Sequence, residues 1–137
     1  MGGLLITGGK ITYVEAKRDK DDPVSGLSIN VGIDDVVIEE GVVEVKYTYT
    51  VNYTDGVGSL KIVGSIYAEE EPDMVKRIND EWTKNRRLPD DFAETIINSI
   101  NYACGTNGTL VVRPLNLAAP MIPPRVRLEQ PAGSKRG

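Results

Sequence analysis

Apolar and polar residues alternate strictly over residues 43–53, where valine and tyrosine take the odd positions and polar residues the even ones. A period of two places these sets on opposite faces of a β-strand. After a turn that contains Gly56 and Gly58, apolar or small residues recur at every second position over residues 60–68. Glycine allows the positive φ angles of tight hairpins. The pattern predicts a β-hairpin with one apolar face.

The same alternation marks strands upstream of this hairpin. Residues 27–34 alternate Leu, Ile, Val and Ile with polar or small residues, and a first strand is expected over residues 11–17. The charged residues 17–23 between them are typical of a solvated loop. These segments predict a four-stranded antiparallel meander, and one of its faces is apolar enough to need a cover.

The second half of the chain predicts the helices that supply this cover. A short helix is expected to begin at Pro72, and a longer one after Pro89, with Gly105 and Gly108 as candidate stops. The prolines in residues 110–124 favour an extended or irregular segment. The chain is therefore predicted to be an α+β protein with one long helix after the strands. The apolar stripe of that helix, at three-four spacing, is Phe92, Ala93, Ile96, Ile97, Ile100, Ala103 and Cys104.

Length and charge narrow the class of protein. The 137 residues suit a single domain, expected over residues 1–129, with a disordered tail at 130–137. The net charge of −4 argues against nucleic acid as a partner. No apolar run approaches the roughly 20 residues that cross a bilayer, so no membrane insertion is expected. Residues 1–9 lack the basic start of a secretory signal, so a cytoplasmic location is expected.

The residues needed for most catalytic sites are missing from the sequence. The chain has no histidine, so neither Ser-His-Asp nor Cys-His arrangements can form within it. The single cysteine, Cys104, lies on the apolar stripe of the predicted helix, where an inert buried thiol is expected. The carboxylate pairs Asp34-Asp35 and Asp90-Asp91 are interpreted as solvating or capping groups. We therefore expect no enzyme, no catalytic residue, no metal and no cofactor.

Two apolar features have two interpretations each. Three tyrosines share the apolar face of residues 43–53, and residues 110–122 are apolar yet rich in proline. Both sets can be core, packed between sheet and helix. Alternatively, part of this surface stays open as a groove, since tyrosine joins apolar area to a polar tip. Trp82 allows the same two interpretations.

The order of elements resembles the SecB-like family of protein-export chaperones. The resemblance is sharpest at residues 91–97 (Asp-Phe-Ala-Glu-Thr-Ile-Ile), at 109–110 (Thr-Leu) and at 115–118 (Leu-Asn-Leu-Ala), with Pro120 soon after. It spans roughly residues 11–124.

The sequence also departs from that family. Ala119 is inserted before Pro120, Arg113-Pro114 lengthens the linking segment, and Pro123-Pro124 replaces the start of a final helix. The tail is basic at Lys135-Arg136, and the acidic docking surface for the export motor has no counterpart. The likeness is to a divergent member, archaeal or linked to a toxin–antitoxin system.

The resemblance implies an ATP-independent holdase, which binds unfolded or non-native polypeptides in apolar grooves and assembles as a homotetramer, a dimer of dimers. An open sheet edge and exposed apolar surface fit either a partner subunit or a client. The candidate residues for client contact are Tyr47, Tyr49, Trp82, Leu115, Leu117, Met121 and Ile122.

Two alternatives from other classes stay open at the level of sequence. One is a hot-dog-type acyl-thioester enzyme, although its helix normally precedes the long strands and the missing histidine weakens it. The other is a non-enzymatic assembly module whose apolar surfaces are entirely used in oligomerisation. The sequence identifies neither the clients nor a motor or antitoxin partner.

Overall fold

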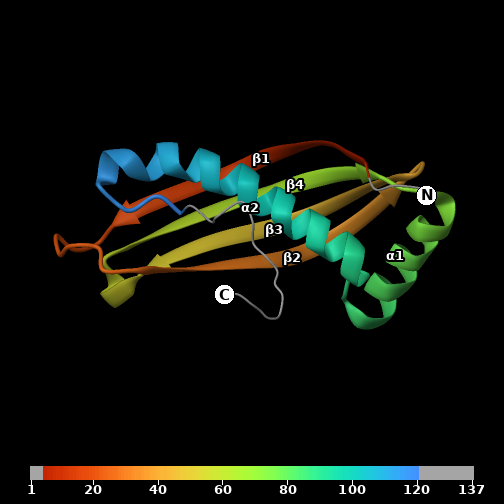
Figure 1. Cartoon of the computed structure of the whole chain (residues 1–137), viewed down its shortest axis with the longest axis horizontal. Helices are drawn as coiled ribbons and strands as arrows, with labels where there is room; N and C mark the ends of the chain where they lie inside the picture. The colour runs from red at the N-terminus through yellow and green to blue at the C-terminus, as the bar shows by residue number, and fades with distance from the viewer. Residues whose placement is uncertain (1–4, 121–137) are drawn as a thin grey trace, which may run out of the picture.

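The structure, a computed structural model, describes residues 5–120 and contains four strands followed by two helices (Figure 1). The prediction of an α+β fold with a four-stranded antiparallel sheet and a long helix after it is confirmed. The expected tail at 130–137 lies outside the described residues. The elements are β1 (Leu5–Arg18), β2 (Leu27–Glu39), β3 (Val42–Tyr53), β4 (Gly58–Glu69), α1 (Pro72–Asn85) and α2 (Asp90–Val112), with short 3₁₀ turns at Thr54–Gly56 and Arg113–Leu115.

The strands lie in the order β1-β4-β3-β2, and all neighbours are antiparallel. Strands β2, β3 and β4 form a meander as predicted, but β1 pairs with β4 instead of β2, so the simple four-strand order was wrong. The connection of residues 19–26 explains the difference, because it wraps around the β3–β4 turn. The amide of Asp19 donates to the carbonyl of Val57 at 2.7 Å, and that of Thr54 donates to Gly26 at 3.0 Å. Strands β1 and β2 are consequently the two edges of the sheet.

One face of the sheet forms the core. The odd-numbered residues of β3 are buried and lie in register with the even-numbered residues of β4, so that Tyr49 pairs with Ile62. The opposite, outer face is polar and held by cross-strand hydrogen bonds. The hydroxyl of Ser65 donates to Glu44 at 2.7 Å, and that of Thr48 donates to Asp34 at 2.5 Å. The apolar face therefore needs the cover of α2, and the outer face does not.

Both helices begin at prolines, as the sequence predicts. Pro72 opens α1, which buries Ile78 and Trp82. Pro89 is extended, and its carbonyl accepts the amide of Ala93 at 2.8 Å to close the first turn of α2. The core stripe of α2 is completely buried against the sheet. It consists of Phe92, Ile96, Ile100 and Cys104.

The predicted stops at Gly105 and Gly108 were wrong, because α2 continues to Val112. A glycine inside a helix costs about 1 kcal/mol relative to alanine. Here the missing side chain leaves room for neighbours. A Cβ at Gly108 would lie 2.8 Å from a Leu60 methyl and 3.2 Å from Pro120. These glycines are therefore sites of close packing within the helix.

After α2 the chain turns back along the helix. We call residues 117–120 the strap. Two core tyrosines of β3 hold it by its carbonyl groups, with the hydroxyl of Tyr53 donating to Ala118 at 2.5 Å and that of Tyr49 donating to Pro120 at 3.4 Å. The guanidinium of Arg18 donates to the carbonyls of Leu115 and Asn116 at 3.1 and 3.0 Å. The strap is part of the core and fills the space beside the glycines of α2.

Gly64 of β4 offers a test of this packing. A Cβ there would collide with the carbonyl oxygen of Lys10 and would lie 2.7 Å from the hydroxyl of Tyr47. Gly64→Ala should lower the free energy of unfolding in urea by about 1–3 kcal/mol, the usual cost of overpacking. Gly32→Ala is the matched control, because its Cβ would meet nothing closer than 3.9 Å. It should leave stability unchanged or raise it by about 0.5 kcal/mol. Equal effects of the two substitutions would contradict the packing described here.

Candidate functional site

The exposed large apolar side chains of the described residues all lie on β1 and α2. Tyr102 and Leu110, on the outer side of α2, are the most exposed at 76% and 65%. Ile11 and Val14 of β1 lie in register with Gly64 and Ile62, so they share the apolar face of the sheet. Tyr13 lies in register with Val63 after a register shift and belongs to the outer face. Exposed apolar patches on a soluble protein commonly mark a binding surface.

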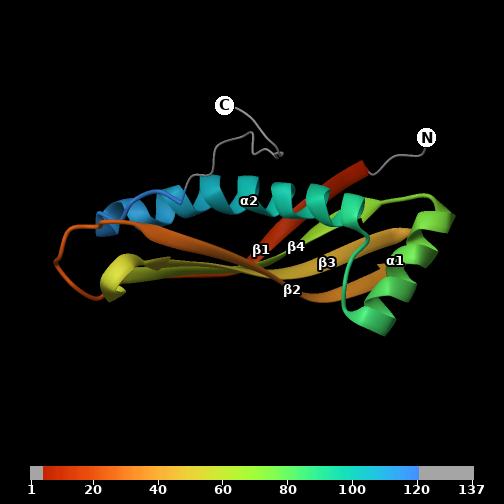
Figure 2. The ribbon, with the colours of Figure 1, turned by 60° about the horizontal axis from the view of Figure 1, so that its bottom comes forward.

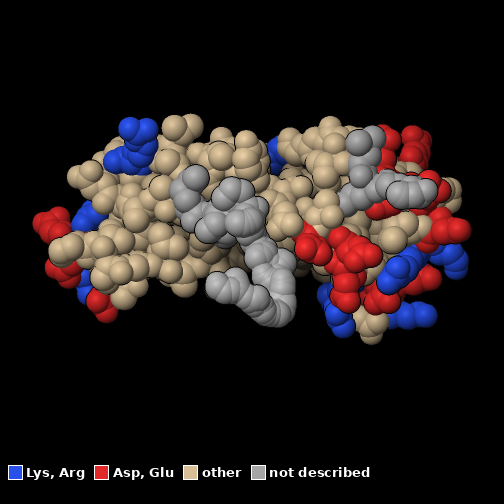
Figure 3. All heavy atoms as spheres, viewed as in Figure 1, with Lys and Arg blue, Asp and Glu red and all other residues tan. Residues whose placement is uncertain are grey.

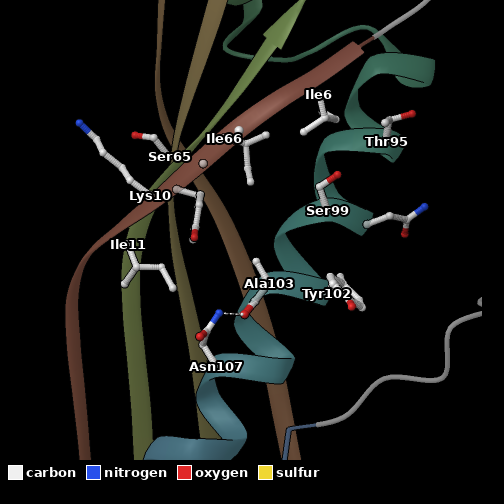
Figure 4. Close-up of a pocket in the computed structure, with 14 residues that line it drawn as sticks. Ile6, Lys10, Ile11, Ser65, Ile66, Thr95, Ser99, Tyr102, Ala103 and Asn107 are labelled. Atoms are coloured by element: carbon white, nitrogen blue, oxygen red, sulfur yellow. Dashed lines mark hydrogen bonds between the residues drawn. The ribbon is translucent and has the colours of Figure 1, made fainter.

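A groove of about 690 Å³ separates β1 from α2. Its floor includes Tyr47 of β3 and Ile66 of β4. Ile6 on the strand side lies near Thr95 and Ser99 on α2, whereas the Lys10 side chain points away from the helix (Figure 4). The groove is therefore apolar at its base and carries small polar groups along the helix.

The shape of the groove follows from irregularities in β1. The pairing of β1 with β4 shifts register between Ile6 and Gly8 and again between Ile11 and Tyr13. Bulges of this kind bend an edge strand and increase its twist. Gly8 adds no side chain, and a Cβ there would meet nothing within 4 Å. Figure 2 shows β1 running obliquely to α2. One helix therefore cannot close against the whole length of β1.

The groove floor is uncharged at neutral pH. The thiol of Cys104 donates to the hydroxyl of Tyr47 at 3.6 Å beneath it. Burial raises the pKa of Cys104 to about 11, although the hydrogen bond with Tyr47 opposes the shift. Burial also raises the pKa of Tyr49 to about 12 and that of Tyr47 still further. A buried thiol whose pKa is raised is a poor nucleophile, so the floor offers contact area and no reactive group.

The structure places one of the sequence-predicted residues, Tyr47, beneath the groove, where its side chain is buried. Tyr49, Trp82 and Leu117 are buried in the core, and Leu115 is half-buried. Client contact by these four side chains needs a rearrangement and stays a prediction. Met121 and Ile122 lie outside the described residues.

Sequence reasoning missed the residues that line most of the groove. They belong to the first half of β1 and to the outer side of α2, such as Ile6 and Ser99. Two signals were present. Gly8-Gly9 inside an alternating segment is a usual mark of a bulge. Tyr102 lies off the apolar stripe of α2, where an aromatic side chain has no packing role.

Residues 5–120 contain neither a metal-binding cluster nor a membrane-spanning helix. No group of three or more Asp, Glu or Cys side chains in this part of the chain is arranged to hold a metal ion. No helix of the same part is both long and apolar enough to cross a membrane.

Comparison with known proteins identifies the fold. No family model and no curated protein sequence matches the chain. A solved structure that matches is the Mycobacterium tuberculosis SecB-like chaperone Rv1957, in complex with a ChAD peptide from the antitoxin HigA1 (Rv1956). The TM-score is 0.55 at 10% sequence identity, over 93% of this chain and 90% of that chain. The chain therefore has the SecB-like fold, as the sequence predicted. A likeness at this identity defines architecture and leaves activity to be argued from the site.

The raised pKa values under α2 predict a pH dependence of stability. Cys104 and Tyr49 keep their protons to higher pH in the folded chain than their ordinary values of 9.0 and 10.0 allow. The unfolded chain binds fewer protons above pH 9, so the free energy of unfolding should fall as pH rises toward 11–12, by at most about 1.4 kcal/mol per pH unit and group.

Urea titrations at several pH values measure this dependence. Cys104→Ala should reduce the slope between pH 9 and 11, whatever its effect on absolute stability. Leu110→Ala is the matched control, because this exposed side chain of the same helix carries no titratable group and should leave the slope unchanged. A wild-type curve that stays flat through pH 11 would contradict the burial of these groups.

Proposed function

We propose that this protein is an ATP-independent holdase-type chaperone, which binds unfolded or non-native polypeptides in the groove between β1 and α2. The observation that carries the proposal is this groove with Ile11 and Tyr102 exposed in its lining and Val14 exposed nearby on β1. Its volume of about 690 Å³ lies in the range of sites that accept several side chains. The SecB-like fold supports the same conclusion, and the matched chaperone holds a peptide ligand in its structure.

The groove suits an extended segment of low sequence specificity. Ile11 and Tyr102, which are exposed in its lining, offer apolar contact, while Thr95 and Ser99 can bond to a polypeptide backbone. β1 is also an edge strand, so its outward backbone groups can pair with an added strand. Of the residues suggested by sequence, Tyr47 lies closest to the groove, but its side chain is buried and also needs an opened state for direct contact. Contact by Tyr49, Trp82, Leu115, Leu117, Met121 and Ile122 belongs to the same proposal in an opened state.

The order of elements argues against the hot-dog enzyme but not against the assembly module. The hot-dog arrangement places its helix before the long strands, whereas both helices here follow them. An assembly module remains the stronger rival, because a second copy of the chain could cover the same apolar surface. We propose a homo-oligomer, a dimer of dimers in the cytoplasm, that pairs sheet edges and leaves the helix side of β1 open to clients.

Aggregation of a chemically denatured client, followed by light scattering without nucleotide, tests the holdase. Wild-type protein in stoichiometric excess should suppress the signal. Ile11→Asp combined with Tyr102→Asp should reduce that suppression severalfold, because each places a charge at the rim of the apolar groove. Tyr13→Asp is the matched control, since it charges an exposed aromatic on the other face of the same strand. It should behave as wild type.

Either of two results would reject the proposal. One is a wild-type protein that leaves client aggregation unchanged, and the other is an equal effect of the groove and outer-face variants. Circular dichroism should first establish that all variants are folded.

The oligomeric state is tested by sedimentation and native mass spectrometry. A dimer of dimers should have a mass of about 60 kDa, four times the 15.0 kDa of the chain. The oligomer should still bind an apolar dye, because a holdase keeps its groove accessible. A tetramer that binds no dye would instead favour the assembly module, and a stable monomer would exclude the proposed assembly.

A further inference from the structure

The strap runs antiparallel to α2 in a nearly extended conformation. At its start, the amide of Leu117 donates to the carbonyl of Val112 at 3.3 Å. At its end, the carbonyl oxygen of Pro120 lies 3.2 Å from the place of a Cβ on Gly105. The three steps from Leu117 to Pro120 therefore span the seven helix residues from Val112 back to Gly105, a rise of about 10 Å at 1.5 Å per residue. That is also the reach of three extended residues at about 3.3 Å each.

The flank of α2 that carries the strap continues toward the N-terminus of the helix. Residues at three-four spacing share one side of a helix. From Gly105 this spacing leads through Asn101 and Ile97 to Glu94 and Asp90. The side-chain oxygen of Asn101 is buried, yet it has no hydrogen-bond partner among the described residues. This flank therefore offers an unused acceptor followed by two carboxylates.

The residues that follow the strap carry a backbone amide and two arginines in the same order and at the same spacing as the acceptor and the two carboxylates of this flank. Residues 121–127 read Met-Ile-Pro-Pro-Arg-Val-Arg. Two successive prolines favour an extended chain. An extended chain passes about 2.2 helix residues for each of its own residues. An extended continuation from Pro120, which lies beside Gly105, therefore places Ile122 beside Asn101. Arg125 then falls beside Glu94, and Arg127 beside Asp90. The amide of Ile122 is the last before the two prolines, which have none.

The apolar face beside this flank has incomplete cover. Helix α2 lies against β1, β3 and β4, whereas β2 is met chiefly by α1. Along β2 the side chains of Val31, Ile33 and Val36 are only half-buried, although they belong to the core face. Figure 3 shows acidic side chains, with lysine and arginine side chains among them, gathered toward the end of the molecule where α1 lies, and few charged side chains on the part of the middle that is drawn in tan. An apolar segment that ends in arginines complements this uncharged surface and the carboxylates of Glu94 and Asp90.

We propose that residues 121–127 of this chain extend the strap along α2 and cover the flank that faces β2. In this arrangement the amide of Ile122 donates to the Asn101 oxygen. Arg125 pairs with Glu94, and Arg127 pairs with Asp90. Asp90 already lies 3.5 Å from Arg87 at an exposed site, and a carboxylate can accept from both arginines. The extension is an intramolecular occupant, so the β2 side of α2 is closed while the β1 side stays open. This inference goes beyond the proposed chaperone function.

Hydrogen–deuterium exchange of the full chain without any client tests the extension. At low salt the amides of Met121 and Ile122 should exchange well below the rate of an unstructured peptide. Reversing the charges with Arg125→Glu and Arg127→Glu should lower their protection about fivefold, the combined value of two exposed ion pairs. Adding Glu94→Arg and Asp90→Arg should restore it. Lys135→Glu with Arg136→Glu is the matched control, because it changes the net charge equally beyond the reach of these carboxylates.

Each outcome of this experiment either supports or overturns the extension. Loss in the first pair, recovery in the fourfold variant and no change in the control would support the extension. Exchange of Met121 and Ile122 at the unstructured rate in wild type would overturn it. Equal loss in the two charge-reversed pairs would also overturn it, because general charge and not register would then control docking. Because no client is present, failure here leaves the holdase assay unaffected.

Discussion

A single helix has to cover four strands, and this mismatch of widths shapes the molecule. Four strands at about 4.8 Å spacing span roughly 19 Å, whereas a helix with its side chains is about 10 Å across. Helix α2 therefore covers the middle of the apolar face and leaves a margin on each side. The margin along β1 is the groove. On the other margin the strap fills the space beside Gly105 and Gly108.

The sequence predicted the fold well because its signals were local. Alternation over residues 43–53 and 60–68 defined β3 and β4, and the stripe from Phe92 to Cys104 defined the core side of α2. Strand order was harder, because alternation states which residues share a face and not which strand lies beside which. The pairing of β1 with β4 depends on how residues 19–26 wrap around a turn distant in sequence.

The site was less predictable than the fold for a related reason. Apolar side chains look alike in sequence whether they are core or binding surface. The tyrosines of β3 were natural candidates for a groove wall, yet Tyr49 and Tyr53 use their hydroxyls to hold the strap. Gly105 likewise looked like a helix stop, although it marks a place where two segments come close. In each case the deciding contact joins residues that are far apart along the chain.

The pairing of the first strand with the fourth also sets the order in which the chain can fold. Strands β2, β3 and β4 are joined by short turns and can assemble as soon as they leave the ribosome. Strand β1 is synthesised first, yet its partner is not complete until Glu69. Until then its apolar residues stay unprotected, and such long-range pairing is slow and open to aggregation. During its own synthesis, this chain passes through the kind of exposed state that a holdase would recognise in others.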